Sequence, residues 1–135
     1  MVVVKDYNDI MKAFDLVNGD EIWTKYIGGV ISPVISNDIL FDVDNNKIVR
    51  AMDLNTGKVI WSNRIDISKY DVVFNPILMN NQLLLPISNG EIIKINPYNG
   101  VVISRDDLVG QIDVSPIVVK DKLIILSNAV LKVFR

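Results

Sequence analysis

Short apolar runs alternate with polar turns along most of this chain. Runs such as residues 83–85 (LLL) and 123–126 (LIIL) have the length of β-strands and are rich in Val, Ile and Leu. Between the runs lie Asn-Gly, Thr-Gly and Asn-Asp pairs, which are typical of tight hairpin turns. No window shows the sustained i, i+3, i+4, i+7 spacing of an amphipathic helix. The pattern predicts an all-β protein made of short antiparallel strands.

A motif recurs along the chain. Residues 13–23 read AFDLVNGDEIW and residues 51–61 read AMDLNTGKVIW, with a weaker copy, KINPYNGVVIS, at residues 94–104. The glycines of the three copies lie 38 and 43 residues apart. A period of about 40 residues fits helical HEAT-type units or the four-stranded blades of a β-propeller. The short β-rich runs favour propeller blades.

A second marker repeats out of phase with the first. It reads SPVI at residues 32–35, NPIL at 75–78 and SPIV at 115–118, with prolines 43 and 40 residues apart. A polar turn and an apolar run follow each copy. Proline fits the first residue of a strand, where a missing N–H group does least harm. Because two independent markers share the same period, chance does not explain the repeat.

The turn motif has a direct physical interpretation. The carboxylates of Asp15 and Asp53 are placed to accept hydrogen bonds from nearby backbone N–H groups, as in an Asx turn. The glycine four residues later then supplies the positive φ that returns the chain antiparallel. Because both aspartates occupy equivalent positions in the repeat, we interpret them as turn residues rather than as paired catalytic carboxylates.

The repeat also places two tryptophans. Trp23 and Trp61 lie four residues after a repeat glycine, on the returning strand, where a large ring can pack between blades. Quinone stacking and an interface hot spot are the alternatives. Ser104 replaces the tryptophan in the third copy, so we expect looser packing there, or filling by a neighbour such as Tyr98.

The two markers together predict one incomplete propeller domain over residues 1–135. We expect a partial blade at 1–26 without its inner strand, complete four-stranded antiparallel blades at 33–63 and 76–105, and a partial blade at 116–134 without its outer strand. The expected fold is therefore a partial β-propeller with two complete and two partial blades. The longer connection 65–74, with Tyr70, Asp71 and Phe74, is a candidate contact site.

Composition narrows the possible chemistry. The chain has no cysteine and no histidine, which excludes Cys nucleophiles, Ser-His-Asp triads, structural zinc sites and disulfides within it. Its formal charge is −2, so it lacks the basic surface of a nucleic-acid-binding domain. Residues 42–46 (DVDNN) superficially resemble a calcium loop, but Lys47 and Asp53 stand where an EF-hand needs Gly and Glu. We expect a polar hairpin turn there, and we expect no catalytic, cofactor-binding or metal-binding residues in the chain.

The motif at residues 51–61 resembles the tryptophan repeat of quinoprotein dehydrogenases and of their non-enzymatic relatives. Over almost the whole chain, the Ser/Asn-Pro strands, the NG turns and the final run 122–135 resemble the C-terminal part of the BamB family of outer-membrane protein assembly factors. This resemblance implies a non-enzymatic, protein-binding scaffold without a cofactor, at the periplasmic face of the outer membrane. The implied partners are the barrel-assembly machinery or unfolded outer-membrane proteins.

Other interpretations remain open at this point. The chain resembles a fragment of a quinoprotein dehydrogenase, which would bind its quinone and calcium over the propeller axis, with ligands from several blades. It also fits a split or decayed gene product without activity of its own. A signal peptide and the lipid-bearing cysteine of the BamB family are not found in these residues. A fragment, a split gene and self-association that completes a ring are three explanations of the missing blades, and we favour the first two.

Overall fold

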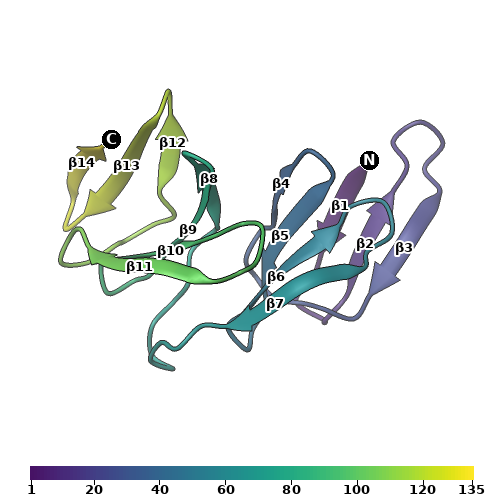
Figure 1. The fold of residues 1–135 in the computed structure, drawn as a ribbon, viewed down its shortest axis with the longest axis horizontal. Coiled ribbons are helices and arrows are strands. Elements are labelled where there is room, and N and C mark those ends of the chain that lie inside the picture. The colour runs from purple at the N-terminus through teal and green to yellow at the C-terminus, as the bar shows by residue number, and fades with distance from the viewer. The chain divides into compact units, whose positions relative to one another are not determined.

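The computed structural model describes all of residues 1–135 as strands, turns and connections (Figure 1). None of its elements is a helix that is long and apolar enough to cross a membrane. The strands are β1 (Val2–Lys5), β2 (Met11–Phe14), β3 (Glu21–Lys25), β4 (Val34–Ser36), β5 (Ile39–Val43), β6 (Ile48–Asp53), β7 (Val59–Arg64), β8 (Ile77–Met79), β9 (Gln82–Pro86), β10 (Glu91–Ile95), β11 (Val102–Asp107), β12 (Ile117–Val119), β13 (Lys122–Ser127) and β14 (Val130–Phe134).

Four antiparallel sheets follow one another along the chain. Strands β1–β2–β3 and β12–β13–β14 form three-stranded sheets, and β4–β5–β6–β7 and β8–β9–β10–β11 form four-stranded sheets. Each strand pairs with its neighbour in sequence, so every sheet is a meander of the kind that builds propeller blades. The fold is all-β, as the sequence pattern predicts. It divides into two compact units, Met1–Ile65 and Asp66–Arg135, with two sheets in each.

Each unit has its own apolar core. In the first unit, the side chains of Met11, Ala13, Trp23, Leu40 and Met52 pack into one buried cluster that joins its two sheets. In the second unit, a cluster of seven buried residues joins the β8–β11 sheet to the β12–β14 sheet: Met79, Leu84, Ile92, Val109, Ile112, Leu123 and Ile125. In β2 and β13 the buried side chains alternate with less buried ones, because successive side chains of a strand point to opposite faces, whereas β5 and β9 are buried on both faces.

Tight hairpins join the first two strands of the sheets in the second unit. Asn80 and Asn81 have φ values of 51° and 58°, and Lys120 and Asp121 have 47° and 63°. Positive φ at both central residues is the property of a type I′ turn, whose twist matches the twist of the flanking strands. The polar residues that separate the apolar runs therefore form true two-residue hairpins.

A tight turn precedes β2, which begins at Met11. Asp6 Oδ1 accepts hydrogen bonds from the amides of Asn8 and Ile10, at 2.9 and 3.2 Å, and Asp9 has a φ of 66°. This side-chain-stabilised turn sets the start of β2.

A β-bulge occurs at the same place in each copy of the repeat. The register shifts between Ala13 and Phe14 in β2, between Ala51 and Met52 in β6, and between residues 94 and 95 in β10. A bulge bends its strand and increases the local twist. The repeat therefore specifies a local distortion of the sheet in addition to its hydrophobic pattern.

Candidate functional site

The carboxylates of the repeated turn are used by the backbone of that turn. Asp15 Oδ1 accepts the amide of Val17 at 2.7 Å, and Asp53 Oδ1 accepts the amide of Asn55 at 2.8 Å. Asn96 Oδ1 accepts the amide two residues further on at 2.9 Å. The three repeat glycines have φ values of 77°, 72° and 76°. The interpretation of these aspartates as turn residues is confirmed.

The acidic segment 42–46 differs from the expected polar turn. Asp44 does form the turn, because its Oδ1 accepts the amides of Asn46 and Ile48 at 2.8 and 3.1 Å, while its Oδ2 lies 2.5 Å from Arg50 Nη1. Asp42, however, belongs to β5 and is fully buried. Both faces of β5 are buried from Leu40 to Val43, so this side chain lies in the interior, which the local sequence alone does not reveal.

Asp42 forms a buried ion pair with Lys5 of β1. The ammonium of Lys5 lies 2.6 Å from Asp42 Oδ1 and also donates to the carbonyls of Val43 and Ile31, at 2.8 and 3.2 Å. Its three N–H donors are thus all used. Asp42 Oδ2 is buried without a hydrogen-bond partner. Burial raises the pKa of the Asp42 carboxyl above its usual value, and the Lys5 charge offsets this only in part.

An open groove of about 650 Å³ runs beside this ion pair in the first unit. Exposed Tyr7 and Val30, together with Pro33 and Ile35, line it with Lys5. Because the Lys5 ammonium already has three acceptors, it has no free N–H donor to offer a ligand in the groove. Lys5 and Asp42 hold β1 against β5.

The two tryptophans have different surroundings. Trp23 is 8% exposed, and its Nε1 donates to the carbonyl of Leu54 at 2.7 Å, which ties the β1–β3 sheet to the β4–β7 sheet. This is the packing between blades that the repeat predicts. Trp61 is half-buried and packs on Phe41 of its own sheet, with ring centroids 6.2 Å apart and tilted by 43°.

The connection before β8 contains both exposed residues and residues that pack against the core. Tyr70 is 82% exposed, with the Lys69 ammonium 5.0 Å from the centre of its ring. Phe74 instead packs against the core of the second unit and donates its amide to the carbonyl of Pro86 at 2.9 Å. Ser88 Oγ accepts the amide of residue 72 at 2.9 Å. Part of this candidate contact site is therefore structural, and its exposed part is centred on Tyr70.

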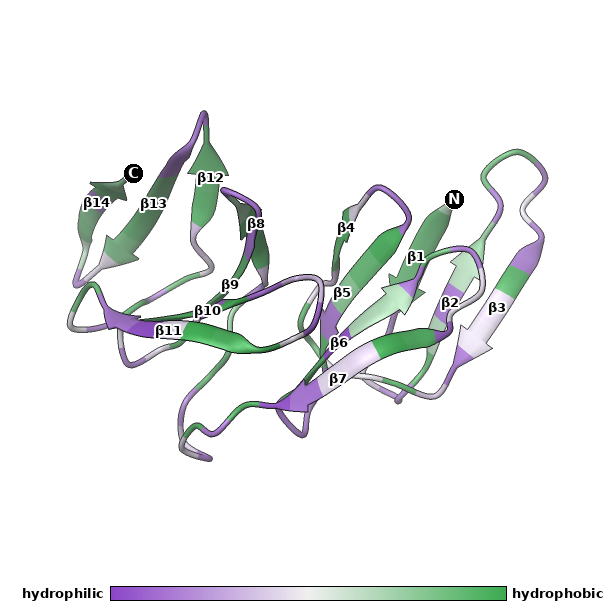
Figure 2. Cartoon of the chain, in the orientation of Figure 1, coloured by the Kyte–Doolittle hydropathy of each residue, from purple (hydrophilic) through white to green (hydrophobic).

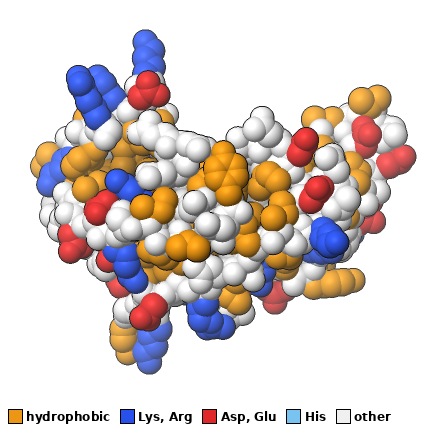
Figure 3. Space-filling model, in the orientation of Figure 1, with side chains coloured by type: hydrophobic (Ala, Val, Ile, Leu, Met, Phe, Trp, Pro, Cys, Tyr) orange, Lys and Arg blue, Asp and Glu red, His pale blue; other side chains and the backbone are white.

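One face of the β12–β14 sheet is apolar and open. Its cross-strand rows are Ile117–Ile124–Val133 and Leu126–Leu131, with Val119 beside them. We call these six residues the outer face of the last sheet. Ile117, Leu131 and Val133 are 56%, 64% and 56% exposed. Figure 2 shows these strands mainly in the hydrophobic colour, and in Figure 3 hydrophobic side chains gather where β13 and β14 lie.

The edge of the same sheet is also open. β14 pairs with β13 on one side, and no strand pairs with its other side. An unpaired edge presents a row of backbone donors and acceptors to any extended segment that approaches it. Together, this edge and the outer face form the candidate interaction surface of the described residues.

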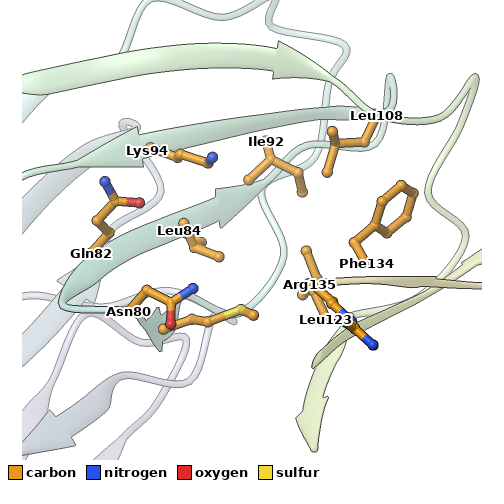
Figure 4. A pocket seen from close by; sticks show the side chains of 10 residues that line it. Asn80, Gln82, Leu84, Ile92, Lys94, Leu108, Leu123, Phe134 and Arg135 are labelled. Carbon is orange, nitrogen blue, oxygen red and sulfur yellow. The ribbon is translucent and has the colours of Figure 1, made fainter. Parts of the chain in front are cut away.

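A cavity of about 170 Å³ lies in the second unit, between its two sheets. Figure 4 shows that side chains from both sheets point into it. Its walls include Leu84, Ile92, Leu108, Leu123 and Phe134. Neither this cavity nor its lining could be found from the sequence, because the residues come from strands far apart in the chain.

No group of three His, Cys, Asp or Glu side chains in the described chain lies close enough together to hold a metal ion.

Tyr98 does not lie in its expected place beside Ser104. It is 73% exposed, and its hydroxyl donates to Asn81 at 3.1 Å, so it does not fill the position of the absent tryptophan.

Comparison with solved structures places this fold among β-propellers. The chain is similar to BamB from Moraxella catarrhalis, with a TM-score of 0.77 and 20% identity over 98% of this chain and 45% of that one. It is similar to the computationally designed Ika8 protein, with a TM-score of 0.76 and 12% identity over 98% of this chain and 42% of that one. The chain thus spans somewhat less than half of each of these two proteins.

Quinohemoprotein alcohol dehydrogenase from Comamonas testosteroni is also similar. The TM-score is 0.59 and the identity 22%, over 73% of this chain and 17% of that enzyme. A search of curated proteins gives no significant match. These structural similarities establish the propeller fold and do not by themselves distinguish an assembly factor from an enzyme.

A family model matches almost the whole chain. The model described as "Outer membrane protein assembly factor BamB" matches residues 1–131. The match includes both complete copies of the Ala-x-Asp motif, the weaker third copy and all three proline markers. It agrees with the resemblance that the repeat suggests. The chain therefore belongs to the PQQ-repeat family of the outer membrane protein assembly factor BamB.

Proposed function

We propose that this chain is part of a non-enzymatic propeller that binds other proteins during outer-membrane protein assembly, at the periplasmic face of the outer membrane. The observation that carries the proposal is the family match over residues 1–131. The partners are the barrel-assembly machinery or unfolded outer-membrane proteins. The residues form one incomplete propeller domain, with its partial blades at 1–26 and 116–134, and the whole ring performs the function.

The structure supports a binding role in two ways. The carboxylates of Asp15, Asp44 and Asp53 are occupied by the amides of their own turns, so they serve the fold. The outer face of the last sheet combines exposed apolar side chains with the free edge of β14. A segment in extended conformation can add to such an edge through backbone hydrogen bonds, and the apolar side chains then supply contact area.

Site-specific photo-crosslinking tests this proposal. A photoreactive residue at Leu131 lies at the free edge, and one at Leu16, which is similarly exposed at 69% but lies in a turn of the first unit, is the matched control. The probes are an unfolded outer-membrane barrel protein diluted from urea and purified barrel-assembly proteins. We expect crosslinks from position 131 that exceed those from position 16. Equal labelling at both positions, or none at either, would contradict the proposal.

A second measurement addresses the enzymatic alternative, in which the chain is a fragment of a quinoprotein dehydrogenase. The chain is incubated with pyrroloquinoline quinone and calcium, and dye reduction is followed with alcohols and sugars as substrates. We expect no turnover above that of the cofactor alone. Saturable turnover would overturn the non-enzymatic part of the proposal.

A further inference from the structure

Three of the residues that line the cavity of the second unit are equivalent to residues that surround a tryptophan ring in the first unit. In the first unit, Ala13 faces Trp23 across β2 and β3. The indole packs in one cluster with Leu40 and Met52, which face each other across β5 and β6 of the next sheet. Two positions on each of the two sheets thus form this site: Trp23 supplies the ring, and Ala13, Leu40 and Met52 pack around it.

The second unit carries the equivalent four positions with different residues. Lys94 faces Ser104 across β10 and β11, and Leu123 faces Phe134 across β13 and β14. Lys94 replaces the alanine of the repeat and Ser104 replaces the tryptophan. Lys94, Leu123 and Phe134 all line the cavity of about 170 Å³. Leu123 and Phe134 are thus the apolar counterparts of Leu40 and Met52, while the repeat supplies no ring in the second unit.

Lys94 does not fill this space with its charged end. Its ammonium pairs with Asp106 Oδ2 at 3.2 Å, and the two side chains are 35% and 37% exposed. The ammonium is thus held near the surface while the aliphatic part of the side chain covers the wall, as is usual for lysine on apolar surface. Asn80, Gln82 and Arg135 contribute polar groups to the lining, and the wall formed by the two sheets is apolar.

The volume suits a single aromatic ring. A cavity of roughly 150 Å³ lined by Leu, Ile and Phe stays dry in a protein and binds benzene. The cavity here has a similar volume, and Leu84, Ile92, Leu108, Leu123 and Phe134 form the apolar part of its lining. An apolar ring that enters it removes its own surface from water and restores contacts that the cavity walls lack.

The surface beside the cavity is cationic. A neighbouring cleft is lined by Lys120, Asp121 and Lys122, and it shares Asn80 and Arg135 with the cavity. Three cationic side chains and one carboxylate therefore surround the approach to the ring site. Complementary charge accelerates encounter and rejects partners of like charge, so this surface favours an acidic segment.

We propose that this cavity binds the aromatic side chain, tryptophan above all, of an acidic segment in a partner protein. The ring occupies the space between the two sheets of the second unit, as Trp23 does in the first. Carboxylates on either side of it face Lys120, Lys122 and Arg135. This inference rests on the proposed protein-binding function and names a second contact, separate from the edge of β14.

Fluorescence polarisation with a labelled peptide tests the proposal. The peptide carries one tryptophan between two pairs of acidic residues, and its counterparts carry alanine for tryptophan or lysines for the acidic residues. We expect saturable binding of the first peptide and at least tenfold weaker binding of both counterparts. Equal affinity for all three peptides, or no saturable binding of the first, would overturn the proposal.

Variants locate the binding in the cavity. The double substitution Lys94→Ala with Ser104→Trp restores the Ala–Trp pair of the other repeats, so the chain fills its own cavity. We expect peptide affinity to fall at least tenfold and the melting temperature to rise. Ile103→Trp adds the same residue at an exposed position of β11, and it should leave peptide binding unchanged. Loss of binding in both variants, or in neither, would contradict the assignment.

Two further measurements complete the design. If the double variant does not fold, Leu108→Trp blocks the cavity from the connection after β11 and should give the same loss. Lys120→Gln with Lys122→Gln should weaken binding of the acidic peptide while free indole still binds. Binding of free indole without binding of any peptide would show that the cavity is a small-molecule site, and it would overturn the proposal that a protein partner binds there.

The two proposals fail in distinguishable ways. Crosslinking from position 131 without peptide binding would remove the cavity inference and leave the scaffold function intact. Peptide binding without crosslinking would leave the ring site standing and refute the proposed contact at β14.

Discussion

Lys5 illustrates how one charged side chain is accommodated inside a β-sheet core. Its side chain is 3% exposed, and the ammonium makes hydrogen bonds to Asp42 and to two backbone carbonyls. Removal of the lysine would leave the Asp42 carboxylate buried without its counter-charge, which costs far more than the net contribution of an intact ion pair. The effect of a substitution here depends on pH.

The first prediction concerns Lys5→Met. At neutral pH we expect the free energy of unfolding to fall by about 3–5 kcal/mol, the usual cost of breaking a buried pair. Urea denaturation monitored by tryptophan fluorescence measures this change. The double variant Lys5→Met with Asp42→Leu removes both charges and should recover most of the loss. A double variant no more stable than Lys5→Met would contradict this account.

The pH dependence follows from the raised pKa of Asp42. The folded chain binds a proton at higher pH than the unfolded chain, whose carboxyl titrates near 3.8. Between those two pKa values the folded state holds more protons, so the contribution of Asp42 to stability falls as pH rises through this window. Asp42→Asn should lack this contribution. Lys5→Met should show a larger loss over a wider pH window, because it also removes the charge that lowers the Asp42 pKa.

Among the structural elements, the repeated turn not only reverses the chain direction but also packs against a side chain of the neighbouring sheet. Gly57, in the turn between β6 and β7, lies directly against Trp23, and a Cβ built there would come within 2.8 Å of Cδ2 of the indole. Gly19 occupies the same place in the preceding copy with nothing within 4 Å of such a Cβ. The turn between β6 and β7 therefore also forms part of the surface on which Trp23 of the β1–β3 sheet packs.

The second prediction compares Gly19→Ala with Gly57→Ala. Both glycines have positive φ, 77° and 72°, so each substitution should cost roughly 1–2 kcal/mol for the left-handed backbone. Gly57→Ala should cost a further 1–3 kcal/mol, on the order of an overpacked core, and it should shift the Trp23 fluorescence. Equal losses in the two variants, measured by urea denaturation, would show that the contact with Trp23 has no energetic effect.

At the scale of the whole molecule, the chain forms two compact units joined at residues 65–66. The connection that follows exposes Lys69 and Tyr70, and residues 66–71 belong to no strand. The turns at Lys120 and Lys122 are also exposed, but they lie in or beside a two-residue hairpin. A protease must bind several residues in extended form, which a tight hairpin resists.

The third prediction is that trypsin cleaves first after Lys69 under native conditions. The products should be residues 1–69 and 70–135, identified by mass spectrometry during limited digestion. Lys69→Gln removes this site and should delay the appearance of the first products severalfold. Initial cleavage within a sheet, or an unchanged rate in the variant, would argue against an accessible connection between the units.

The sequence by itself determined the fold, because its repeat is local. The Asx turns, the repeat glycines and the strand lengths depend on residues a few positions apart, and these agree with the structure. The packing of Trp23 between sheets also followed, since every blade of such a fold must bury its neighbour. Family membership rests on the same repeated residues.

Only the tertiary structure decided the contacts between distant positions. Lys5 and Asp42 are 37 residues apart, and each looks like a surface charge in its own segment. The cavity likewise depends on which strands of two sheets face each other, so the replacement of tryptophan by Ser104 predicted looser packing but not a ring-sized space. Local hydrogen bonds and periodicity specify the blades, whereas the sites arise from packing between them, which no short segment encodes.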